Sequence, residues 1–194
     1  MSRIVPILAL AATLAAAEPT PRLAADGIHV AATGPDMVLS WPSLQDAAYA
    51  RTAHSAVALA ADGRSAVLDF PGGAKLGVAL AGDGFDIDVE RCGDAAAVCV
   101  ELVIPAGMRT GGAWTCGETN GTFPATTPEP PHFFGGNASG FILRHDGKVA
   151  LSLGTPEFSY QQMTDNRAWN WDVCTWRSVV PVGDRRAQHY AVRR

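Results

Sequence analysis

The chain has 194 residues, a net charge of −4, four cysteines and 47% hydrophobic residues. Its basic residues are scattered apart from the pairs Arg185-Arg186 and Arg193-Arg194, so no positive stripe is available to follow a phosphate backbone. Nucleic acid is therefore not an expected partner. This length allows one domain with a hydrophobic core and leaves no comfortable room for a second.

The N-terminal segment has the pattern of a secretory signal peptide. Arg3 supplies a positive charge, an apolar run covers residues 4–14, and Ala15-Ala16-Ala17 precedes Glu18. The run is too short to span a bilayer as a helix, which takes about 20 apolar residues. We expect residues 1–17 to be a signal peptide and 18–194 a single exported domain, secreted or periplasmic, without membrane contact after cleavage. An uncleaved N-terminal anchor is the alternative.

The remaining chain shows short alternating segments separated by Gly, Pro and Asp turns, and no long helical stripe. The expected strands are 27–32, 37–41, 55–59, 65–70, 75–80, 85–91, 97–104, 113–116, 140–144, 148–153, 158–163, 168–176 and 188–192. Residues 44–51 are the only expected helical turn. About a dozen short strands at this spacing predict an all-β fold, specifically an antiparallel β-sandwich.

One long segment, residues 117–136, holds four prolines and the pair Phe133-Phe134, and it leaves little room for regular structure. Long ordered loops are often functional. The alternative is a plain crossover between two sheets whose aromatic pair packs into the core.

A second dense segment reads FDIDVE at residues 85–90. Together with Asp83, its closely spaced carboxylates raise the possibility of calcium binding. Strict alternation instead predicts an amphipathic strand with one acidic, solvated face. No pair of cysteines or histidines has zinc spacing either, so we expect no metal and no cofactor.

The four cysteines form an even set in a chain predicted to reach an oxidising compartment, where disulfides persist. Three pairings are possible. Cys92 and Cys99 flank a turn-like GDAAAV segment and could face each other across a hairpin. That choice leaves Cys116 with Cys174, a link that would tie the strand of Trp114 to the tryptophan-rich segment.

The most distinctive segment is 160–177, YQQMTDNRAWNWDVCTWR, which holds three of the five tryptophans. A strand over 168–176 would place Trp169 and Trp171 on one face and Cys174 and Trp176 on the other. Aromatic rings stack on the apolar faces of sugars, and charged side chains bind their hydroxyls. The candidate binding residues are Asp165, Arg167, Trp169, Trp171 and Trp114. The alternative is that the tryptophans fill the core while Asp165 and Arg167 brace a turn.

No catalytic motif is present, neither GxSxG, nor HExxH, nor a Cys beside a His. Glycoside hydrolysis needs only two carboxyl groups across a cleft, and Glu118, Glu157 and Asp165 could supply them. The catalytic residues are otherwise unknown, and the sequence favours a module that is not an enzyme. The Ala-, Gly- and Arg-rich composition is typical of bacterial proteins.

The order GFILRHDGKVALSL, a short link and YQQMTDNRAWNWDVCTWR resembles the N-terminal or accessory β-sandwich regions of large secreted carbohydrate-active enzymes, over residues 140–177. The resemblance implies that a catalytic domain follows in a longer parent protein, of which the chain is a fragment or a free-standing relative. We therefore expect a carbohydrate-binding or accessory module of polysaccharide processing, with a poly- or oligosaccharide as partner. The alternatives are a glycoside hydrolase or polysaccharide lyase, and an envelope structural or protein-interaction module.

Overall fold

The computed structural model describes residues 21–30, 37–183 and 186–193, and over these residues the chain is all-β. The predicted signal peptide, residues 1–17, lies outside the described residues. Regular helix in the described ranges is confined to three 3-10 turns: η1 (Pro71–Gly73), η2 (Ala106–Met108) and η3 (Asn166–Trp169). None of the described helices is long and apolar enough to cross a membrane.

The described residues form sixteen strands in one sheet, with antiparallel pairing throughout. The strands are β1 (Arg22–Ala24), β2 (Gly27–Val30), β3 (Met37–Leu39), β4 (Ser43–Gln45), β5 (Arg51–Thr52), β6 (Ala56–Leu59), β7 (Ser65–Asp69), β8 (Lys75–Ala81), β9 (Gly84–Arg91), β10 (Ala97–Pro105), β11 (Gly112–Cys116), β12 (Thr119–Thr122), β13 (His132–His145), β14 (Lys148–Asp165), β15 (Val173–Pro181) and β16 (Ala187–Arg193).

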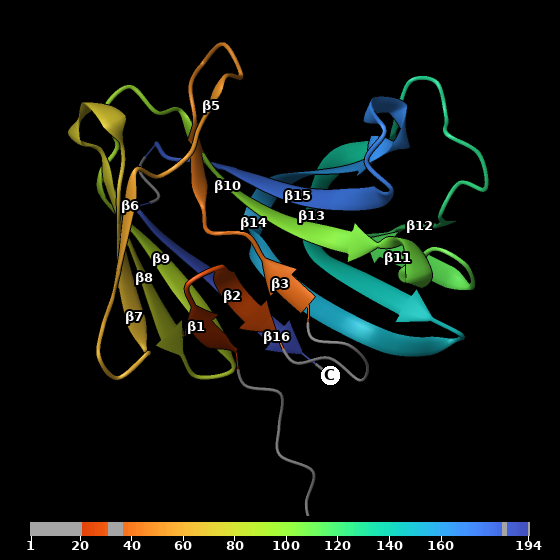
Figure 1. Ribbon diagram of the computed structural model, residues 1–194, viewed down its shortest axis with the longest axis horizontal. Helices are drawn as coiled ribbons and strands as arrows, with labels where there is room; N and C mark the ends of the chain where they lie inside the picture. Colours follow the sequence, from red (N-terminus) through yellow and green to blue (C-terminus); the bar gives the residue numbers. More distant parts are fainter. Residues whose placement is uncertain (1–20, 31–36, 184–185, 194) are drawn as a thin grey trace, which may run out of the picture.

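The sheet order is β1-β2-β3-β10-β15-β14-β16-β9-β8-β7-β6, with β13, β11 and β12 branching from β14 and with β4 and β5 branching from β10. In Figure 1 the β6–β9 part stands at one side of the molecule, while β10, β13 and β15 run across to the other side. Buried side chains from distant strands, including Leu39 of β3, Leu68 of β7 and Phe141 of β13, belong to one hydrophobic cluster. The sheet therefore bends around a single core.

Strand β9 has the alternation of buried apolar and solvent-facing acidic residues that the sequence predicts. Phe85, Ile87 and Val89 are buried, whereas the acidic residues between and after them face away from the core, as the amphipathic interpretation of FDIDVE requires. Asp86 on the polar face lies 2.7 Å from Nδ1 of His189 on the neighbouring β16. Within the described residues no group of three or more His, Cys, Asp or Glu side chains could hold a metal ion.

The prediction of a helical turn over residues 44–51 is wrong. Residues Ser43–Gln45 pair with β10 as β4, and a short turn leads into β5. Oδ1 of Asp46 accepts hydrogen bonds from the backbone N–H groups of Ala48 and Ala50, at 2.9 and 2.8 Å. An Asp side chain that bonds its own backbone in this way competes with helix formation.

The expected strands 148–153 and 158–163 are one strand, β14, which pairs first with β16 and then with β15. The GTPE link falls at an irregularity in the pairing with β13, where Pro156 is tolerated. Behind it, the carbonyl of Ala138 accepts hydrogen bonds from the buried side chains of Thr155, Ser159 and Gln161. The buried polar atoms at this bend are thereby satisfied.

The proposed disulfides are not formed, because Cys92, Cys99, Cys116 and Cys174 are all free. The strand pairing explains this. Strand β10 carries Cys99 opposite Val179 of β15, and it does not pair with β9, which ends just before Cys92. Cys116 of β11 lies opposite Phe141, while Cys174 of β15 lies opposite Asp165 and Ile104. Neither expected pair sits on neighbouring strands.

The segment 117–136 contains more regular structure than expected. Thr119–Thr122 forms β12 against β11, and β13 starts at His132. Phe133 and Phe134 are partly buried and pack near Trp114, with ring centroids 6.0 and 5.2 Å away. The aromatic pair therefore packs against the core, as the crossover alternative predicted, and the irregular part shrinks to the proline-rich segment, residues 123–131.

Candidate functional site

The strand expected over 168–176 starts only at Val173, and the preceding residues form a hydrogen-bonded turn at the upper right of Figure 1. Asp165 ends β14 and its side chain accepts from the N–H of Arg167, which caps η3. Asn170 then adopts a left-handed conformation with φ of 59°, and its N–H donates to the carbonyl of Arg167. The N–H of Trp171 donates to the carbonyl of Asn166. We call residues 166–172 the tryptophan turn.

The tryptophan turn separates the aromatic residues by role. Trp169 and Trp171 are 59% and 51% exposed, whereas Trp176 is 0% exposed and Trp114 is 5% exposed. Trp176 stacks on Phe141 at 4.9 Å, and its Nε1 donates to Oε1 of Gln161 in the core. The sequence predicts one strand with tryptophans on both faces. The structure instead has a turn with two exposed tryptophans, Trp169 and Trp171, followed by a strand that carries the buried Trp176.

Trp114 belongs to β11, and its side chain is covered by the neighbouring strand β12, which leaves little surface for a ligand. Its Nε1 donates to the carbonyl of Thr122 at 3.3 Å, and its ring packs directly against Gly121. A Cβ at Gly121 would clash with the indole ring, so glycine permits this close approach. An aromatic surface for a ligand is therefore restricted, among the candidate tryptophans, to Trp169 and Trp171.

Asp165 and Arg167 form an ion pair between a buried carboxylate and a partly exposed guanidinium, which we call the latch. Asp165 has no exposed surface, and its Oδ2 accepts from Nη2 of Arg167 at 2.5 Å while Oδ1 accepts from Nε at 2.9 Å. The remaining donors of Arg167 reach the carbonyls of Ala125 and Pro124 at 3.0 and 2.8 Å. The N–H of Asp165 donates to the carbonyl of Pro131. The pair therefore fastens both ends of the proline-rich segment to the tryptophan turn.

Burial acts to raise the pKa of the Asp165 carboxyl, but the hydrogen bonds and the positive charge of Arg167 outweigh this effect and lower the pKa below its ordinary value of 3.8. The Asp165 hydrogen bonds raise the pKa of Arg167 in turn. Asp165 is thus a fixed anion with a structural role, and it is poorly placed to exchange protons with a ligand.

Two further residues adjoin the turn, and no pattern in the sequence points to either of them. His132, at the start of β13, lies beside Trp169 with ring centroids 6.5 Å apart, and its Nδ1 lies 2.8 Å from Oγ1 of Thr164. Arg109, just after η2, donates from Nη2 to the exposed carboxylate of Asp172. Both come from segments distant in sequence, and neither stands in a recognisable motif.

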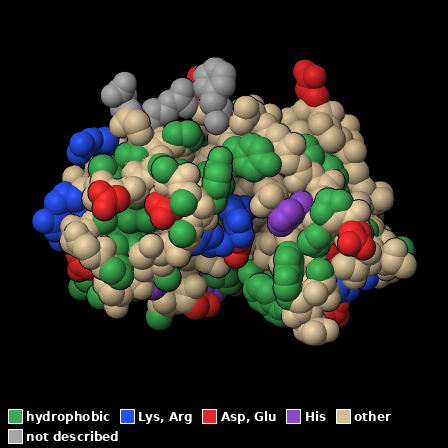
Figure 2. Space-filling model, turned by 90° about the horizontal axis from the view of Figure 1, so that it is seen from above, with side chains coloured by type: hydrophobic (Ala, Val, Ile, Leu, Met, Phe, Trp, Pro, Cys, Tyr) green, Lys and Arg blue, Asp and Glu red, His purple; other side chains and the backbone are tan. Residues whose placement is uncertain are grey.

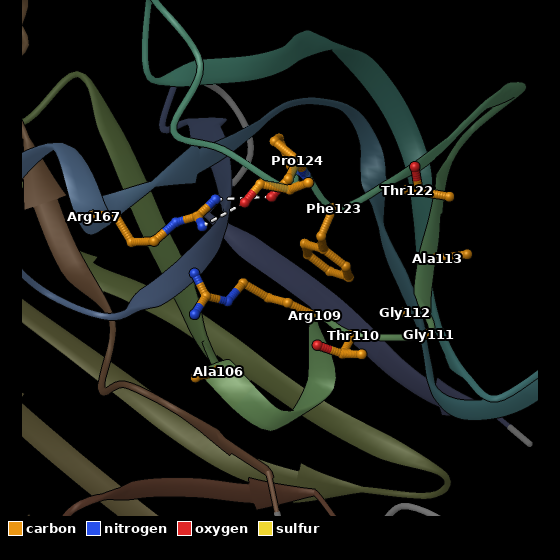
Figure 3. Close-up of a pocket in the computed structure, with 11 residues that line it drawn as sticks. Ala106, Arg109, Thr110, Gly111, Gly112, Ala113, Thr122, Phe123, Pro124 and Arg167 are labelled. Atoms are coloured by element: carbon orange, nitrogen blue, oxygen red, sulfur yellow. Dashed lines mark hydrogen bonds between the residues drawn. The ribbon is translucent and has the colours of Figure 1, made fainter.

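Beside the turn lies a pocket of about 520 Å³, formed by the segment after η2, the start of β11, the end of β12, the proline-rich segment and Arg167. Figure 3 shows the guanidinium groups of Arg109 and Arg167 extending toward the same part of this pocket, with Phe123 and Pro124 beside them. Gly112 lies so close to Met108 and Phe123 that a Cβ there would clash with both. We call this the arginine pocket.

A second pocket, of about 710 Å³, lies at the other end of the same hairpin, where β11 turns into β12. It brings together Glu118 and Glu157 with Phe134 and Asn137. Two of the three carboxylates considered for acid–base chemistry therefore share a pocket, and Asp165 is not among the residues that line it. We call this the glutamate pocket.

The outer surface around these features is mixed in character. On the face seen in Figure 2, which is the upper side of Figure 1, apolar, basic and histidine side chains lie close together and acidic side chains are interspersed.

No protein-family model matches the chain, and no curated protein matches it. Among solved structures, it is similar to a GH31 family sulfoquinovosidase from E. rectale in complex with an aza-sugar inhibitor, at 7% identity and a TM-score of 0.46. The match covers 89% of this chain and 32% of that enzyme's chain, so the chain spans about a third of the enzyme's length.

Proposed function

We propose that the chain is an exported, non-catalytic carbohydrate-binding module of polysaccharide processing, and that Trp169 and Trp171 form its sugar platform. The observation that carries the proposal is the exposure of two large aromatic rings, 59% and 51%, two residues apart on one hydrogen-bonded turn. Large aromatic side chains gain most from burial, so two of them left exposed on one turn form the kind of apolar patch that marks a binding surface.

The rigidity of the turn supports a binding role. Three backbone hydrogen bonds, the Asp165–Arg167 latch and the Asn166–Thr175 side-chain bond at 3.2 Å hold the backbone that carries both rings before a ligand arrives. A surface held in its binding conformation loses less conformational entropy on association. His132 beside Trp169 supplies a polar group for sugar hydroxyls.

Within this proposal the bent sheet is an antiparallel β-sandwich scaffold, and the single hydrophobic cluster to which distant strands contribute supports this interpretation. The secreted or periplasmic location follows from the signal-peptide pattern. A polysaccharide or oligosaccharide outside the cytoplasm is the corresponding partner.

The platform is tested by binding to a glycan array and to insoluble polysaccharides. We expect the double variant W169A/W171A to lose at least tenfold in affinity for any glycan that the wild-type chain binds, because both stacking surfaces are removed. Tyr49→Ala is the matched control, since Tyr49 is an exposed aromatic on the β4–β5 turn. Unchanged glycan binding by W169A/W171A would overturn the platform.

A second candidate function is a glycoside hydrolase or polysaccharide lyase centred on the glutamate pocket. The specific observation in its favour is that Glu118 and Glu157 line one pocket with Phe134. Two carboxyl groups across a sugar-sized space are the minimum that glycoside hydrolysis requires. Asp165 has no part in this candidate, because its carboxylate is buried against Arg167.

The catalytic candidate is tested by release of reducing ends, and of unsaturated products, from a panel of polysaccharides. Activity that falls by a thousandfold or more in both E118Q and E157Q, and that is unchanged in the control E90Q on strand β9, would establish it. Activity that survives either substitution would remove this candidate and leave the binding module.

A further inference from the structure

We propose that the arginine pocket binds the anionic group of an acidic saccharide, a carboxylate or a sulfate, with Arg109 as the principal donor. The inference rests on the proposed sugar platform and deepens it, because it assigns the charge of the ligand. It also makes a claim about the pocket that can hold or fail independently of the platform.

The lining of the arginine pocket has one sign of charge. Arg109 and Arg167 are its only charged lining residues among those described, and the rest are Ala, Gly, Thr, Pro and Phe. Asp165 and Asp172, which pair with the two arginines, do not line it. The glutamate pocket at the opposite end of the hairpin has the reverse character, with Glu118 and Glu157 as its charged lining. The two pockets therefore favour different ligands.

Arg109 has a donor without an acceptor. Its Nη2 donates to Asp172, but Nη1 is buried and has no hydrogen-bond partner among the described residues. A buried N–H group that lacks an acceptor is costly, and a charged donor more so. Because Nη1 is itself buried, a ligand oxygen reaches it only when the Arg109 side chain shifts away from Asp172. An anionic oxygen would then remove this cost with a charge-assisted bond.

Arg167 has a different role in the same pocket. Its donors are committed to Asp165, Ala125 and Pro124, so it holds the proline-rich wall in place. Its guanidinium lines the pocket, and Asp165 balances its charge from outside the lining. A fixed cation beside a second cation that has a spare donor is an arrangement that favours a planar or tetrahedral anion over a neutral hydroxyl. Thr110 and Thr122 add hydroxyl groups to the lining.

The pocket adjoins the sugar platform through two of its own residues. Arg167 precedes Trp169 by two positions, and the Arg109–Asp172 ion pair connects the pocket to the residue after Trp171. Asp172 is exposed, so it holds Arg109 from the solvent side and competes with any incoming anion. A ring stacked on the turn could thus present an acidic substituent to Arg109, with partial displacement of Asp172.

The test measures binding by titration calorimetry at low and at physiological salt, with three oligosaccharides of matched length: a polygalacturonate, a sulfated glucan and a neutral glucan. We expect the wild-type chain to prefer one of the acidic ligands by about tenfold or more, with the preference reduced by salt. Whether polygalacturonate or the sulfated glucan binds tighter identifies the anionic group.

Two variants give opposite expectations. Arg109→Gln should reduce the affinity for the acidic ligand to that for the neutral one, while Asp172→Asn should raise it severalfold, because the competing charge is removed. Arg64→Gln, on an exposed turn between β6 and β7, is the matched control and should bind as wild type. Thermal unfolding of each variant verifies folding, and Asp172→Asn keeps the test decisive if Arg109→Gln does not fold.

The proposal is overturned if the wild-type chain binds glycans without preferring the acidic ones, or if Asp172→Asn weakens acidic binding. Its failure is distinguishable from failure of the platform. If W169A/W171A loses all glycan binding while the wild-type chain binds acidic and neutral glycans equally, the platform is retained and the pocket is rejected. Absence of glycan binding, combined with a rise in the unfolding midpoint of wild type but not of Arg109→Gln in free galacturonate or sulfate, would retain the pocket and reject the platform.

Discussion

Nη2 of Arg167 lies 2.5 Å from Oδ2 of Asp165, a carboxylate with 0% exposed side-chain surface. The two residues are separated by only one position, yet they connect three parts of the chain: the end of β14, the tryptophan turn and the proline-rich segment, whose carbonyls at Pro124 and Ala125 accept the remaining Arg167 donors. One ion pair therefore sets the position of the exposed tryptophans and of one wall of the arginine pocket.

Removing the cation of this latch should destabilise the fold. Arg167→Gln would leave the Asp165 carboxylate buried without its counter-ion, and we expect a loss of about 2–4 kcal/mol in the free energy of unfolding, allowing for the partial exposure of Arg167. Urea unfolding followed by tryptophan fluorescence measures the change. The control Arg64→Gln should stay within about 0.5 kcal/mol of wild type. A similarly small effect of Arg167→Gln would show that the latch contributes little.

The same pair predicts a pH dependence. The pKa of Asp165 is lower in the folded protein than its ordinary value of 3.8, so between these two values the unfolded chain binds more protons than the folded one. The stability that Asp165 contributes is therefore complete above about pH 4 and is lost as the pH falls through its folded pKa. The difference in unfolding free energy between wild type and Asp165→Asn, measured from pH 6 down to pH 2.5, should shrink across the acid end. A constant difference would contradict this.

Much of the sheet could be predicted from the sequence because most strands carry an alternating pattern with clear turns. Strand β9 is an example, since each of its buried residues is apolar and its acidic residues lie between them. The elements that were missed are short or lack alternation. β5 has two residues, and β12 reads TNGT, which carries no apolar pattern. It pairs with β11 in a hairpin that places Trp114 against Gly121, a close contact that no alternation in TNGT indicates.

The candidate site was predictable only in part. The tryptophans of segment 160–177 indicate where the candidate site lies. The strand expected over 168–176 does not begin until Val173, because Asp165 caps η3 and Asn170 takes a left-handed conformation. The alternation of apolar and polar residues can be read from a sequence. The capped turn depends instead on Arg167, whose acceptors Pro124 and Ala125 are distant in the chain. Arg109 could not be found at all, since its ion pair with Asp172 spans 63 positions of the chain.

The free cysteines lead to a chemical prediction. Burial raises the pKa of Cys116 to about 12 and that of Cys174 to about 11, and it raises the pKa of Cys99 as well. At pH 8 these thiols carry little thiolate and are shielded, so we expect at most the half-buried Cys92 to react with Ellman's reagent in the folded protein. All four should react in denaturant. Detection of a Cys92–Cys99 or Cys116–Cys174 bridge by mass spectrometry of the unreduced protein would contradict the free state.

The exposed and buried tryptophans should separate cleanly in stability measurements. Trp176→Ala removes a fully buried ring that stacks on Phe141 and a donor to Gln161, and we expect a loss of about 3–5 kcal/mol. Trp169→Ala and Trp171→Ala remove side chains that are more than half exposed, so each should cost less than about 1 kcal/mol. Urea unfolding monitored by circular dichroism measures all three without relying on the fluorescence that the substitutions change. A large cost at Trp169 or Trp171 would mean that the turn serves the fold, and that loss of glycan binding in W169A/W171A reports unfolding in place of a missing platform.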